Sequence, residues 1–417
     1  MVFLACLLLV NSADPIAPAD SWPEFRGPTG DGIANSLAKP PTQFGETKNL
    51  RWKVPIHDLG WSSPVVAGNQ IWLTTATKFG TDYYAICIDR ITGKTAHDLK
   101  LFHHSKPTDI TRFNTYASPT PVLAEGKLFV HFGTFGTACV DPATGKTIWE
   151  RTDIECNHFR GPASSPVYFN GKLYLLFDGF DRQFVICLDA ANGKTVWQKD
   201  RDLPYRNSGK PEVDNDYKKA FATASIVMVA GKPQLVAPAA MGTIAYDPAT
   251  GDEIWRVITD GMNQASRPVL ANGLVYVTAG NLSTLFAIKP DGHGNITKSH
   301  VAFKKEKIAP TRPSPLVVGD TLFFVNDTGI MVALNAKTGQ EFWKESLGDK
   351  FSSSPIVANG MIYLGSEAGT MFVIKAGKTY EPIAKIKLDD PIRASPAAVG
   401  KDLIVRTYSN LYCFEAK

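Results

Sequence analysis

The chain has 417 residues, with 44 basic side chains against 40 acidic ones and a formal net charge of +4 at pH 7. So small an imbalance gives no electrostatic ground for a nucleic-acid or membrane-surface partner. Hydrophobic residues make up 44% of the chain, enough for a large core, and the length alone would permit two or three domains.

The N-terminal segment has the composition of an export signal. Residues 1–10 form an apolar stretch too short to span a bilayer, and small residues and proline follow it. This pattern is typical of a secretory signal. We therefore expect residues 1–19 to be a signal segment, cleaved within residues 12–19, and the protein to be periplasmic or secreted. Cys6 offers the alternative of a lipid anchor, which is disfavoured because most of the apolar run follows it.

From residue 50 onward, short apolar runs alternate with turn residues. Each unit opens with Ser-Pro or a related pair, followed by an apolar run, a Gly-centred turn and a second apolar run, as in residues 63–73. Alternation with period two and frequent β-branched residues predict strands and hairpins. The mean spacing of about 47 residues is typical of four-stranded propeller blades. The eight units open at Pro64, Pro121, Pro166, Ile226, Pro268, Pro315, Pro355 and Pro396.

A second turn recurs inside the units and ends in a tryptophan. Residues 141–149, 189–197, 247–255 and 335–343 begin with Asp or Asn and carry Trp eight residues later. Glycine four residues after the opening residue can take a positive φ, which predicts a tight hairpin. These glycines are Gly93, Gly145, Gly193, Gly251 and Gly339. We expect five tryptophans to pack between neighbouring units and donate Nε1–H to a carbonyl; they are Trp52, Trp149, Trp197, Trp255 and Trp343.

The ends of the chain predict how the ring closes. The eighth unit stops at residues 412–417, which leaves no residues for an outer strand, and an unpaired edge would favour aggregation. Residues 50–54 resemble residues 253–257, and Trp52 lies 12 residues before Pro64, as Trp343 lies 12 before Pro355. The N-terminal strand should therefore complete the last blade. The predicted fold is all-β: an eight-bladed β-propeller of four-stranded antiparallel blades over residues 50–417, preceded by an arm at residues 20–49.

The repeated Ala/Cys-x-Asp-x-x-Thr-Gly-Lys-x-x-Trp pattern resembles a known family. It looks like the tryptophan-docking repeat of pyrroloquinoline-quinone (PQQ) dehydrogenase propellers and of their non-enzymatic relatives, the BamB-like outer-membrane assembly lipoproteins, over roughly residues 50–417. Residues 22–32 also resemble the lead-in of secreted PQQ-like repeat proteins of planctomycete-type bacteria. The resemblance implies the fold far more strongly than the function, because one scaffold hosts unrelated sites.

Four cysteines occupy one repeat position, where the other units carry Ala or Val: Cys87, Cys139, Cys187 and Cys413. A position that accepts Ala or Val needs a small buried apolar group, and free Cys serves that role. We expect no disulfides among them, because equivalent positions in different blades lie far apart.

Candidate site residues stand three positions before each unit's opening residue, where the inner strand borders the central channel. They are Trp61, Ser118, Ala163, Thr223, Ala265, Arg312, Ser352 and Arg393, with Arg160 and Arg267 nearby. An aromatic face beside converging guanidiniums suits a flat polyanion, and the family resemblance suggests PQQ, a planar tricarboxylate. Alternatively, the arginines pair with acidic residues of the blades and keep the channel mouth hydrated.

A PQQ dehydrogenase needs more than this pocket. The resemblance implies Ca²⁺ ligands, an Asp base and often an adjacent Cys-Cys pair. The chain has no Cys-Cys, and no matching set of Glu, Asn and Asp is identifiable. These departures disfavour a dehydrogenase.

Two predicted insertions interrupt the repeat, and long loops on a rigid scaffold often carry binding residues. Residues 97–115 include His103 and His104, and residues 200–220 include Asp214 and Asp216. Either pair could bind a cation, but neither shows a complete ligand pattern, so exposed loop positions are the favoured interpretation. Residues 291–295 replace the usual turn of the fifth unit and predict an altered hairpin.

The sequence thus favours an exported, non-catalytic and monomeric propeller that acts as a binding or assembly scaffold for a protein segment or an anionic small molecule. The alternative is a quinoprotein oxidoreductase that uses PQQ and Ca²⁺ to oxidise an alcohol or a sugar.

Overall fold

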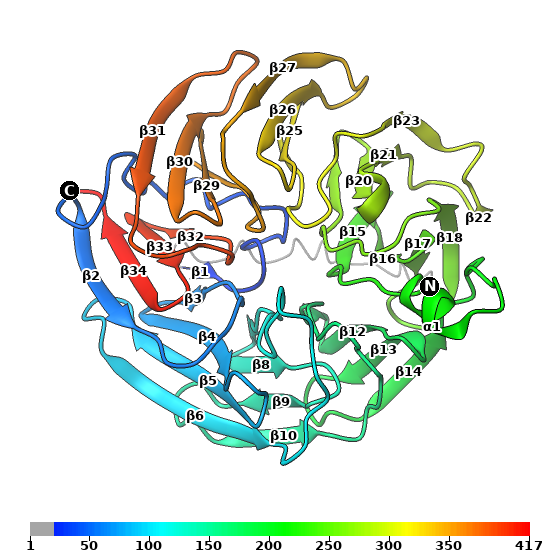
Figure 1. Ribbon diagram of the computed structural model, residues 1–417, viewed down its shortest axis with the longest axis horizontal. Helices are drawn as coiled ribbons and strands as arrows, with labels where there is room; N and C mark the ends of the chain where they lie inside the picture. Colours follow the sequence, from blue (N-terminus) through cyan, green and yellow to red (C-terminus); the bar gives the residue numbers. More distant parts are fainter. Residues whose placement is uncertain (1–20) are drawn as a thin grey trace, which may run out of the picture.

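A ring of eight sheets forms the molecule (Figure 1). The computed structural model describes residues 21–417, so the predicted signal segment and Cys6 lie outside the described residues. The sheets follow one another around the ring in chain order, and their main strands pair antiparallel. The prediction of an eight-bladed propeller with four-stranded antiparallel blades is confirmed. Between residues 21 and 417, no helix has the length and apolar character needed to cross a bilayer.

The first half of the ring holds blades 1 to 4. Blade 1 contains β3 (Val65–Ala67), β4 (Gln70–Ala76), β5 (Asp82–Asp89) and β6 (Thr95–His103). Blade 2 contains β7 (Val122–Ala124), β8 (Lys127–His131), β9 (Thr137–Val140) and β10 (Thr147–Arg151). Blade 3 contains β11 (Val167–Phe169), β12 (Lys172–Asp178), β13 (Gln183–Asp189) and β14 (Thr195–Asp200). After the short helix α1 (Pro211–Asp216), blade 4 contains β15 (Ser225–Val229), β16 (Lys232–Ala239), β17 (Gly242–Tyr246) and β18 (Glu253–Ile258).

The second half holds blades 5 to 8. Blade 5 contains β19 (Val269–Ala271), β20 (Leu274–Thr278), the 3₁₀ turn η1 (Gly280–Leu282), β21 (Leu285–Ile288) and β23 (Val301–Lys305). Blade 6 contains β24 (Leu316–Val318), β25 (Thr321–Val325), β26 (Ile330–Asn335) and β27 (Glu341–Ser346). Blade 7 contains β28 (Ile356–Ala358), β29 (Met361–Gly365), β30 (Thr370–Lys375) and β31 (Pro382–Lys387). Blade 8 contains β32 (Ala397–Val399), β33 (Asp402–Arg406), β34 (Asn410–Glu415) and β2 (Leu50–Pro55).

The ring closes as the sequence predicts. Strand β2 pairs antiparallel with β34, and Trp52 lies opposite Cys413. Phe44 packs on Phe414 just outside this pair, with ring centroids 4.7 Å apart. The last blade therefore takes its outer strand from the N-terminal part of the chain, which covers the edge of β34 that would otherwise be open.

The core lies between neighbouring blades, where the repeat cysteines occupy buried positions. All four are fully buried. Each faces the outer-strand residue across the strand pair; the partners of Cys413, Cys139 and Cys187 are Trp52, Trp149 and Trp197, and that of Cys87 is His97. A small side chain leaves room beside a large indole, which accounts for the preference for Cys, Ala or Val at this position.

Four of the five repeat tryptophans donate Nε1–H to a backbone carbonyl of the next blade. The acceptor oxygens of Trp52, Trp149, Trp197 and Trp343 belong to Arg90, Ala190, Pro248 and Gly377, at 2.9 to 3.0 Å. The five turn glycines have φ between 71° and 74°; three of them, Gly93, Gly193 and Gly251, lie against Trp52, Trp149 and Trp197, whereas Gly145 faces Leu99 and His97 and Gly339 faces Phe303. A Cβ on Gly93, Gly193 or Gly251 would fall 2.7 to 2.8 Å from the neighbouring indole. The glycine thus serves both the turn and the contact between blades.

Trp255 departs from this pattern. Its Nε1–H donates to the side-chain Oε1 of Gln234 in its own blade at 2.8 Å, and Gln234 in turn donates to the Pro290 carbonyl of blade 5 at 3.2 Å. The cause is the altered hairpin of blade 5, in which β22 (Gly294–Asn295) pairs parallel with β18 beside Trp255. The prediction of a direct bond to a neighbouring carbonyl is therefore corrected for Trp255.

The N-terminal arm crosses the channel. Strand β1 (Ser21–Trp22) pairs with β3 of blade 1, and both strands are labelled near the centre of Figure 1. Residues beyond β1 reach blades 5, 6 and 7: Arg267 binds Glu24, Arg26 binds the Ser314 carbonyl, and the Val357 N–H donates to the Gly32 carbonyl. Because blades 1 and 5 lie opposite each other in a ring of eight, a segment that contacts both crosses the axis.

Candidate functional site

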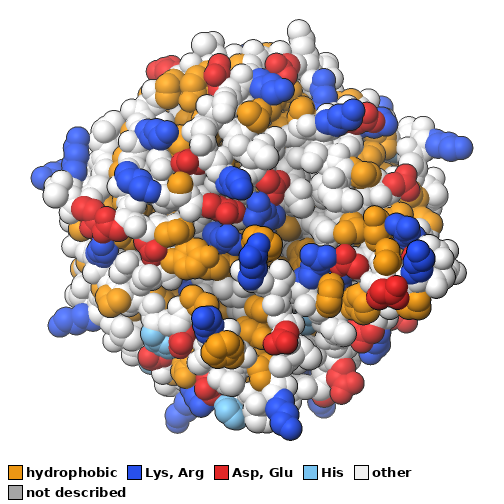
Figure 2. Space-filling model, viewed as in Figure 1, with side chains coloured by type: hydrophobic (Ala, Val, Ile, Leu, Met, Phe, Trp, Pro, Cys, Tyr) orange, Lys and Arg blue, Asp and Glu red, His pale blue; other side chains and the backbone are white. Residues whose placement is uncertain are grey.

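A cavity of about 470 Å³ opens at one mouth of the channel. Figure 2 shows lysine and arginine side chains around the hollow at the centre of this face. The eight candidate residues that stand three positions before the unit openings all line the cavity, and Arg160 lines it as well. The structure therefore brings together residues that are spread over more than 300 positions of the chain.

Trp61 forms one wall of the cavity. Its ring centroid lies 4.3 Å from that of Tyr408, and the Arg393 guanidinium lies 5.3 Å from the Trp61 ring. The backbone N–H of Trp61 donates to the Ala117 carbonyl of the next unit. Trp61 is thus held between blades 8 and 2 and presents its face beside a cation, as the sequence suggested.

The guanidiniums of Arg312 and Arg393 are already paired with carboxylates. Arg312 contacts Asp327 at 2.6 Å and Glu367 at 2.9 Å, and it also donates to the Ser352 hydroxyl at 2.9 Å. Arg393 contacts the other oxygen of Glu367 at 3.2 Å. These contacts match the alternative in which the arginines pair with acidic residues of the blades.

The supporting residues of this wall share a position that sequence reasoning missed. Asp327, Glu367 and Tyr408 each lie two residues after the second strand of their blade, in blades 6, 7 and 8. Comparison of that turn across the repeats would have singled them out, since most blades carry other residue types there. Arg312 and Asp327 belong to the same unit, whereas the contacts of Glu367 with Arg312 and Arg393 and of Tyr408 with Trp61 join different blades and leave no local signal in the sequence.

Arg160 is paired in the same way from the opposite side of the mouth. Its Nε and Nη2 donate to the two carboxylate oxygens of Asp216 at 2.9 and 2.7 Å, a forked geometry. Asp216 ends α1 in the loop between blades 3 and 4. The neighbouring loop is tied to this one because Asn114 donates to the Arg160 and Pro162 carbonyls. Residues of both insertions therefore frame the mouth.

Arg267 is not among the side chains that line the cavity. Its buried guanidinium contacts Glu24 at 2.9 Å and donates to the Phe25 carbonyl and the Ser225 hydroxyl. Burial raises the pKa of Glu24, while the Arg267 charge opposes that shift. The sequence analysis grouped Arg267 with the candidate site because Arg267 lies two residues after Ala265. In the structure, Arg267 instead anchors the N-terminal arm beneath the residues that line the cavity.

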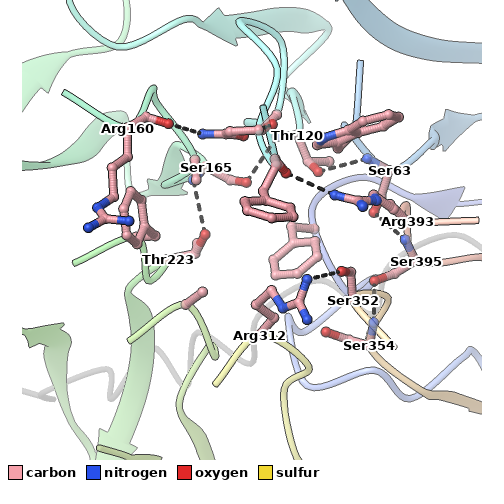
Figure 3. A pocket seen from close by; sticks show the side chains of 18 of the residues that line it. Ser63, Thr120, Arg160, Ser165, Thr223, Arg312, Ser352, Ser354, Arg393 and Ser395 are labelled. Carbon is pink, nitrogen blue, oxygen red and sulfur yellow. Dashed lines mark hydrogen bonds between the residues drawn. The ribbon is translucent and has the colours of Figure 1, made fainter. Parts of the chain in front are cut away.

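A belt of hydroxyl groups joins the blades at the inner end of the cavity. Seven backbone N–H groups each donate to a hydroxyl of the next blade at 2.8 to 3.0 Å, and Figure 3 shows several of these bonds. The donor and acceptor residues are Ser63 to Thr120, Thr120 to Ser165, Ser165 to Thr223, Arg267 to Ser314, Ser314 to Ser354, Ser354 to Ser395, and Ser395 to Ser63. The signal for this belt was the Ser or Thr that directly precedes six of the seven opening prolines, all except Pro268.

Phe25 of the arm forms part of the cavity lining, and two further guanidiniums, which do not line the cavity, are buried in the molecule. Arg26 donates to the carbonyls of Ser314 and Pro315, and Arg406 donates to the Ser62 hydroxyl beside the belt. Neither forms a salt bridge within residues 21–417. Burial lowers the pKa of both guanidiniums to about 9. The Asp31 carboxylate lies close enough to act on the Arg26 charge, so among residues 21–417 it is the Arg406 charge that has no neighbouring carboxylate.

The cation sites considered from sequence are not assembled. His103 bonds to Asp82 and His104 to the Phe135 carbonyl, so the two rings serve different partners. Asp214 accepts from Ser208. In the described part of the chain, no cluster of three or more His, Cys, Asp or Glu side chains converges on a metal position. Residues 97–103 also belong to strand β6, which corrects the predicted start of the first insertion.

The lining does not fit a PQQ and Ca²⁺ pair. Its side chains are aromatic, hydroxyl, amide, alanine and guanidinium groups, and none is a carboxylate. Ca²⁺ sites are built mainly from carboxylate and carbonyl oxygens, and the Arg charges that could meet a tricarboxylate already face Asp216, Asp327 and Glu367. The donor set therefore suits neither the metal nor a highly charged cofactor.

Comparisons with known proteins agree on the architecture. The family described as outer membrane protein assembly factor BamB matches residues 43–176, 181–297 and 292–379. BamB of Legionella pneumophila (strain Paris) is 24% identical over 147 residues, which span 35% of this chain and 36% of that protein, little more than a third of its length.

Two solved structures share the fold at low identity. BamB from Moraxella catarrhalis superposes with a TM-score of 0.61 at 13% identity, covering 88% of this chain and 99% of that one. Quinohemoprotein alcohol dehydrogenase from Comamonas testosteroni superposes with a TM-score of 0.70 at 12% identity, covering 96% of this chain and 81% of that one. Because the family match extends over most of the sequence, this chain belongs to the family of outer membrane protein assembly factor BamB.

Proposed function

We propose that the protein is an exported, non-catalytic propeller that binds a segment of another protein in its central cavity. The observation that carries the proposal is the lining: aromatic rings and hydroxyl groups from all around the ring, with no carboxylate among them. Aromatic rings provide apolar contact area, and hydroxyls provide adaptable hydrogen bonds. BamB relatives are described as outer membrane protein assembly factors, which supports a scaffold role in the periplasm or outside the cell.

The chemistry of the lining also argues against catalysis. General acid–base catalysis uses His, Asp, Glu, Lys, Tyr or Cys, and none of these lines the cavity. Of the lining hydroxyls, that of Ser352 does donate to a carboxylate, Glu367, but Glu367 is also bound by Arg312 and Arg393. A binding role needs no such group.

A cavity-filling variant tests the proposal. Ala265→Trp places an indole in the cavity, while Ala143→Trp adds the same side chain to an exposed turn of blade 2. Quantitative co-purification from envelope fractions of the native host should show one set of partners that both the wild type and Ala143→Trp retain and Ala265→Trp loses. Equal recovery with all three proteins would contradict binding in the cavity.

The quinoprotein alternative has a direct test as well. Quinohemoprotein alcohol dehydrogenase shares the fold, and Trp61 with Arg393 offers a stacking surface. Titration of the purified protein with PQQ and CaCl₂, followed by dye reduction with ethanol or glucose, should give no saturable absorbance change and no turnover. Saturable binding that is lost in Trp61→Ala would favour the oxidoreductase instead.

A further inference from the structure

The hydroxyl belt turns donor groups toward the cavity. Six of its hydroxyls line the cavity: Ser63, Thr120, Ser165, Thr223, Ser354 and Ser395. Each oxygen accepts a backbone N–H from the preceding blade. A hydroxyl has one proton to donate, and within the described residues none of the six donates it to a protein acceptor. The inner end of the cavity therefore presents a ring of O–H groups that lack an acceptor.

Side-chain acceptors are scarce in the same lining. Asn114 uses its Oδ1 to accept from Ser118 at 2.5 Å, which leaves the buried Oδ1 of Asn263 as the amide acceptor that meets no donor. Other unpartnered groups are donors, including Nε of Arg393 and Nε1 of Trp61. A ligand that satisfies this lining must bring acceptor oxygens.

The charge around the cavity favours an anionic acceptor. Three lining guanidiniums face the carboxylates of Asp216, Asp327 and Glu367, whereas the buried Arg406, which donates to Ser62 beside the belt residue Ser63, forms no salt bridge within residues 21–417. Buried charges are ordinarily paired. A negative charge at the belt would be attracted to the nearby Arg406 guanidinium, and hydrogen bonds to a charged acceptor are about twice as strong as neutral ones.

The arm decides which part of a protein can enter. Phe25 lines the cavity, and residues 22–34 bridge opposite blades beneath it. An extended chain cannot pass through a channel that is crossed in this way, so an internal segment could only lie across the mouth. A chain end, in contrast, can insert its last residues, with apolar side chains against Phe25, Trp61, Phe113 and Phe221.

We propose that the cavity binds the C-terminal carboxylate of a partner polypeptide, with its oxygens at the hydroxyl belt and its last side chains against the aromatic walls. This proposal rests on the proposed function and specifies the part of the partner that is bound. The capture of a C-terminal carboxylate by converging donors is an established mode of peptide recognition.

Affinity selection with paired peptide libraries tests the proposal. The probes are Gly-Gly-X-X-X pentapeptides with the last three positions randomised, prepared as free acids and as C-terminal amides, and equilibrated with the full chain. The free-acid library should yield retained peptides with aromatic or aliphatic residues at the end. The same sequences as amides should bind about tenfold more weakly or worse, because the amide loses the charged acceptor. Equal retention of acids and amides, or retention of neither, would overturn the proposal.

The belt provides a matched pair of variants. Ser354→Ala and Ser314→Ala each remove one belt hydroxyl and one bond between blades, but only Ser354 lines the cavity. Affinity for a selected free-acid peptide should fall about tenfold in Ser354→Ala and stay unchanged in Ser314→Ala. A similar loss in both variants would indicate an effect on the ring alone and would contradict a direct contact.

A competitor separates a chain end from a free small carboxylate. If 3-phenylpropionate displaces a selected peptide at an equal concentration, the ligand is a small carboxylate and the assignment to a chain end is overturned. If acid and amide peptides bind equally and both are lost in Ala265→Trp, the carboxylate proposal fails while protein binding in the cavity stands. If no peptide binds and Ala265→Trp retains all partners, the proposed function fails as well.

Discussion

The contact between a turn glycine and the preceding blade's tryptophan makes a quantitative prediction for Gly251→Ala. Gly251 has a φ of 74°, and an added Cβ would lie 2.7 Å from Cδ2 and Cε3 of Trp197. Gly231, in another turn of the same blade, has a φ of 78° and nothing within 4 Å of the corresponding position. Both substitutions incur the same cost of placing L-alanine in the left-handed region, about 1–2 kcal/mol, and the same change in the unfolded chain. The two variants therefore differ only in the clash with the indole.

Overpacking of a close-packed contact costs about 1–3 kcal/mol. The free energy of unfolding should therefore fall by about 1–2 kcal/mol in Gly231→Ala and by about 2–5 kcal/mol in Gly251→Ala. Equilibrium urea unfolding, followed by tryptophan fluorescence, measures the difference. In a double-mutant cycle with Trp197→Leu, the excess cost of Gly251→Ala should disappear. Equal destabilisation of the two glycine variants would refute the role of the glycine in the contact between blades.

Three further predictions follow from buried polar groups. Trp255→Phe should lower the free energy of unfolding, measured with urea, by about 1–3 kcal/mol more than Trp197→Phe. The reason is that Trp255→Phe leaves the buried Oε1 of Gln234 without a donor, whereas the Pro248 carbonyl that accepts from Trp197 also accepts from the Tyr174 hydroxyl. Burial lowers the pKa of His131 to about 3, so the unfolded chain takes up a proton below pH 6.5 that the folded chain does not; stability should fall by up to about 1.4 kcal/mol per pH unit from pH 6.5 toward 3, and His131→Asn should reduce that slope in acid unfolding experiments. Arg267→Met should raise amide hydrogen exchange in residues 21–34 without changing exchange in the outer strands; unchanged protection of the arm would contradict its anchoring role.

The fold was readable from the sequence because each blade repeats the same local signals. The turn with its glycine and tryptophan, the spacing of about 47 residues and the strand at residues 50–54 together predicted eight blades and the closure of β2 on β34. The same register also predicted that Trp61, Arg312 and Arg393 lie together around the channel, because equivalent positions of all blades face the axis. Trp255 departs where the turn at residues 291–295 already looked unusual.

The rest of the site depends on contacts that no local pattern records. Asp216 reaches Arg160 from a loop outside the repeat. Phe25 lies in a segment whose path across the channel could not be inferred from blade spacing, so neither the cavity floor nor the role of Arg267 was predictable. The absence of carboxylates from the lining likewise became visible only once the cavity was defined in three dimensions.

The chain end of a partner protein is proposed to bind in the cavity. Photo-crosslinking from p-benzoylphenylalanine tests this most directly when it replaces Phe113, which lines the cavity and is 60% exposed, and, as a control, Val196, which is 45% exposed on the outer strand β14. In the native host, mass spectrometry of the products from position 113 should identify peptides that contain the C-terminus of a partner protein, and position 196 should yield none of them. Crosslinks from position 113 to internal peptides alone, or the same products from both positions, would contradict the account.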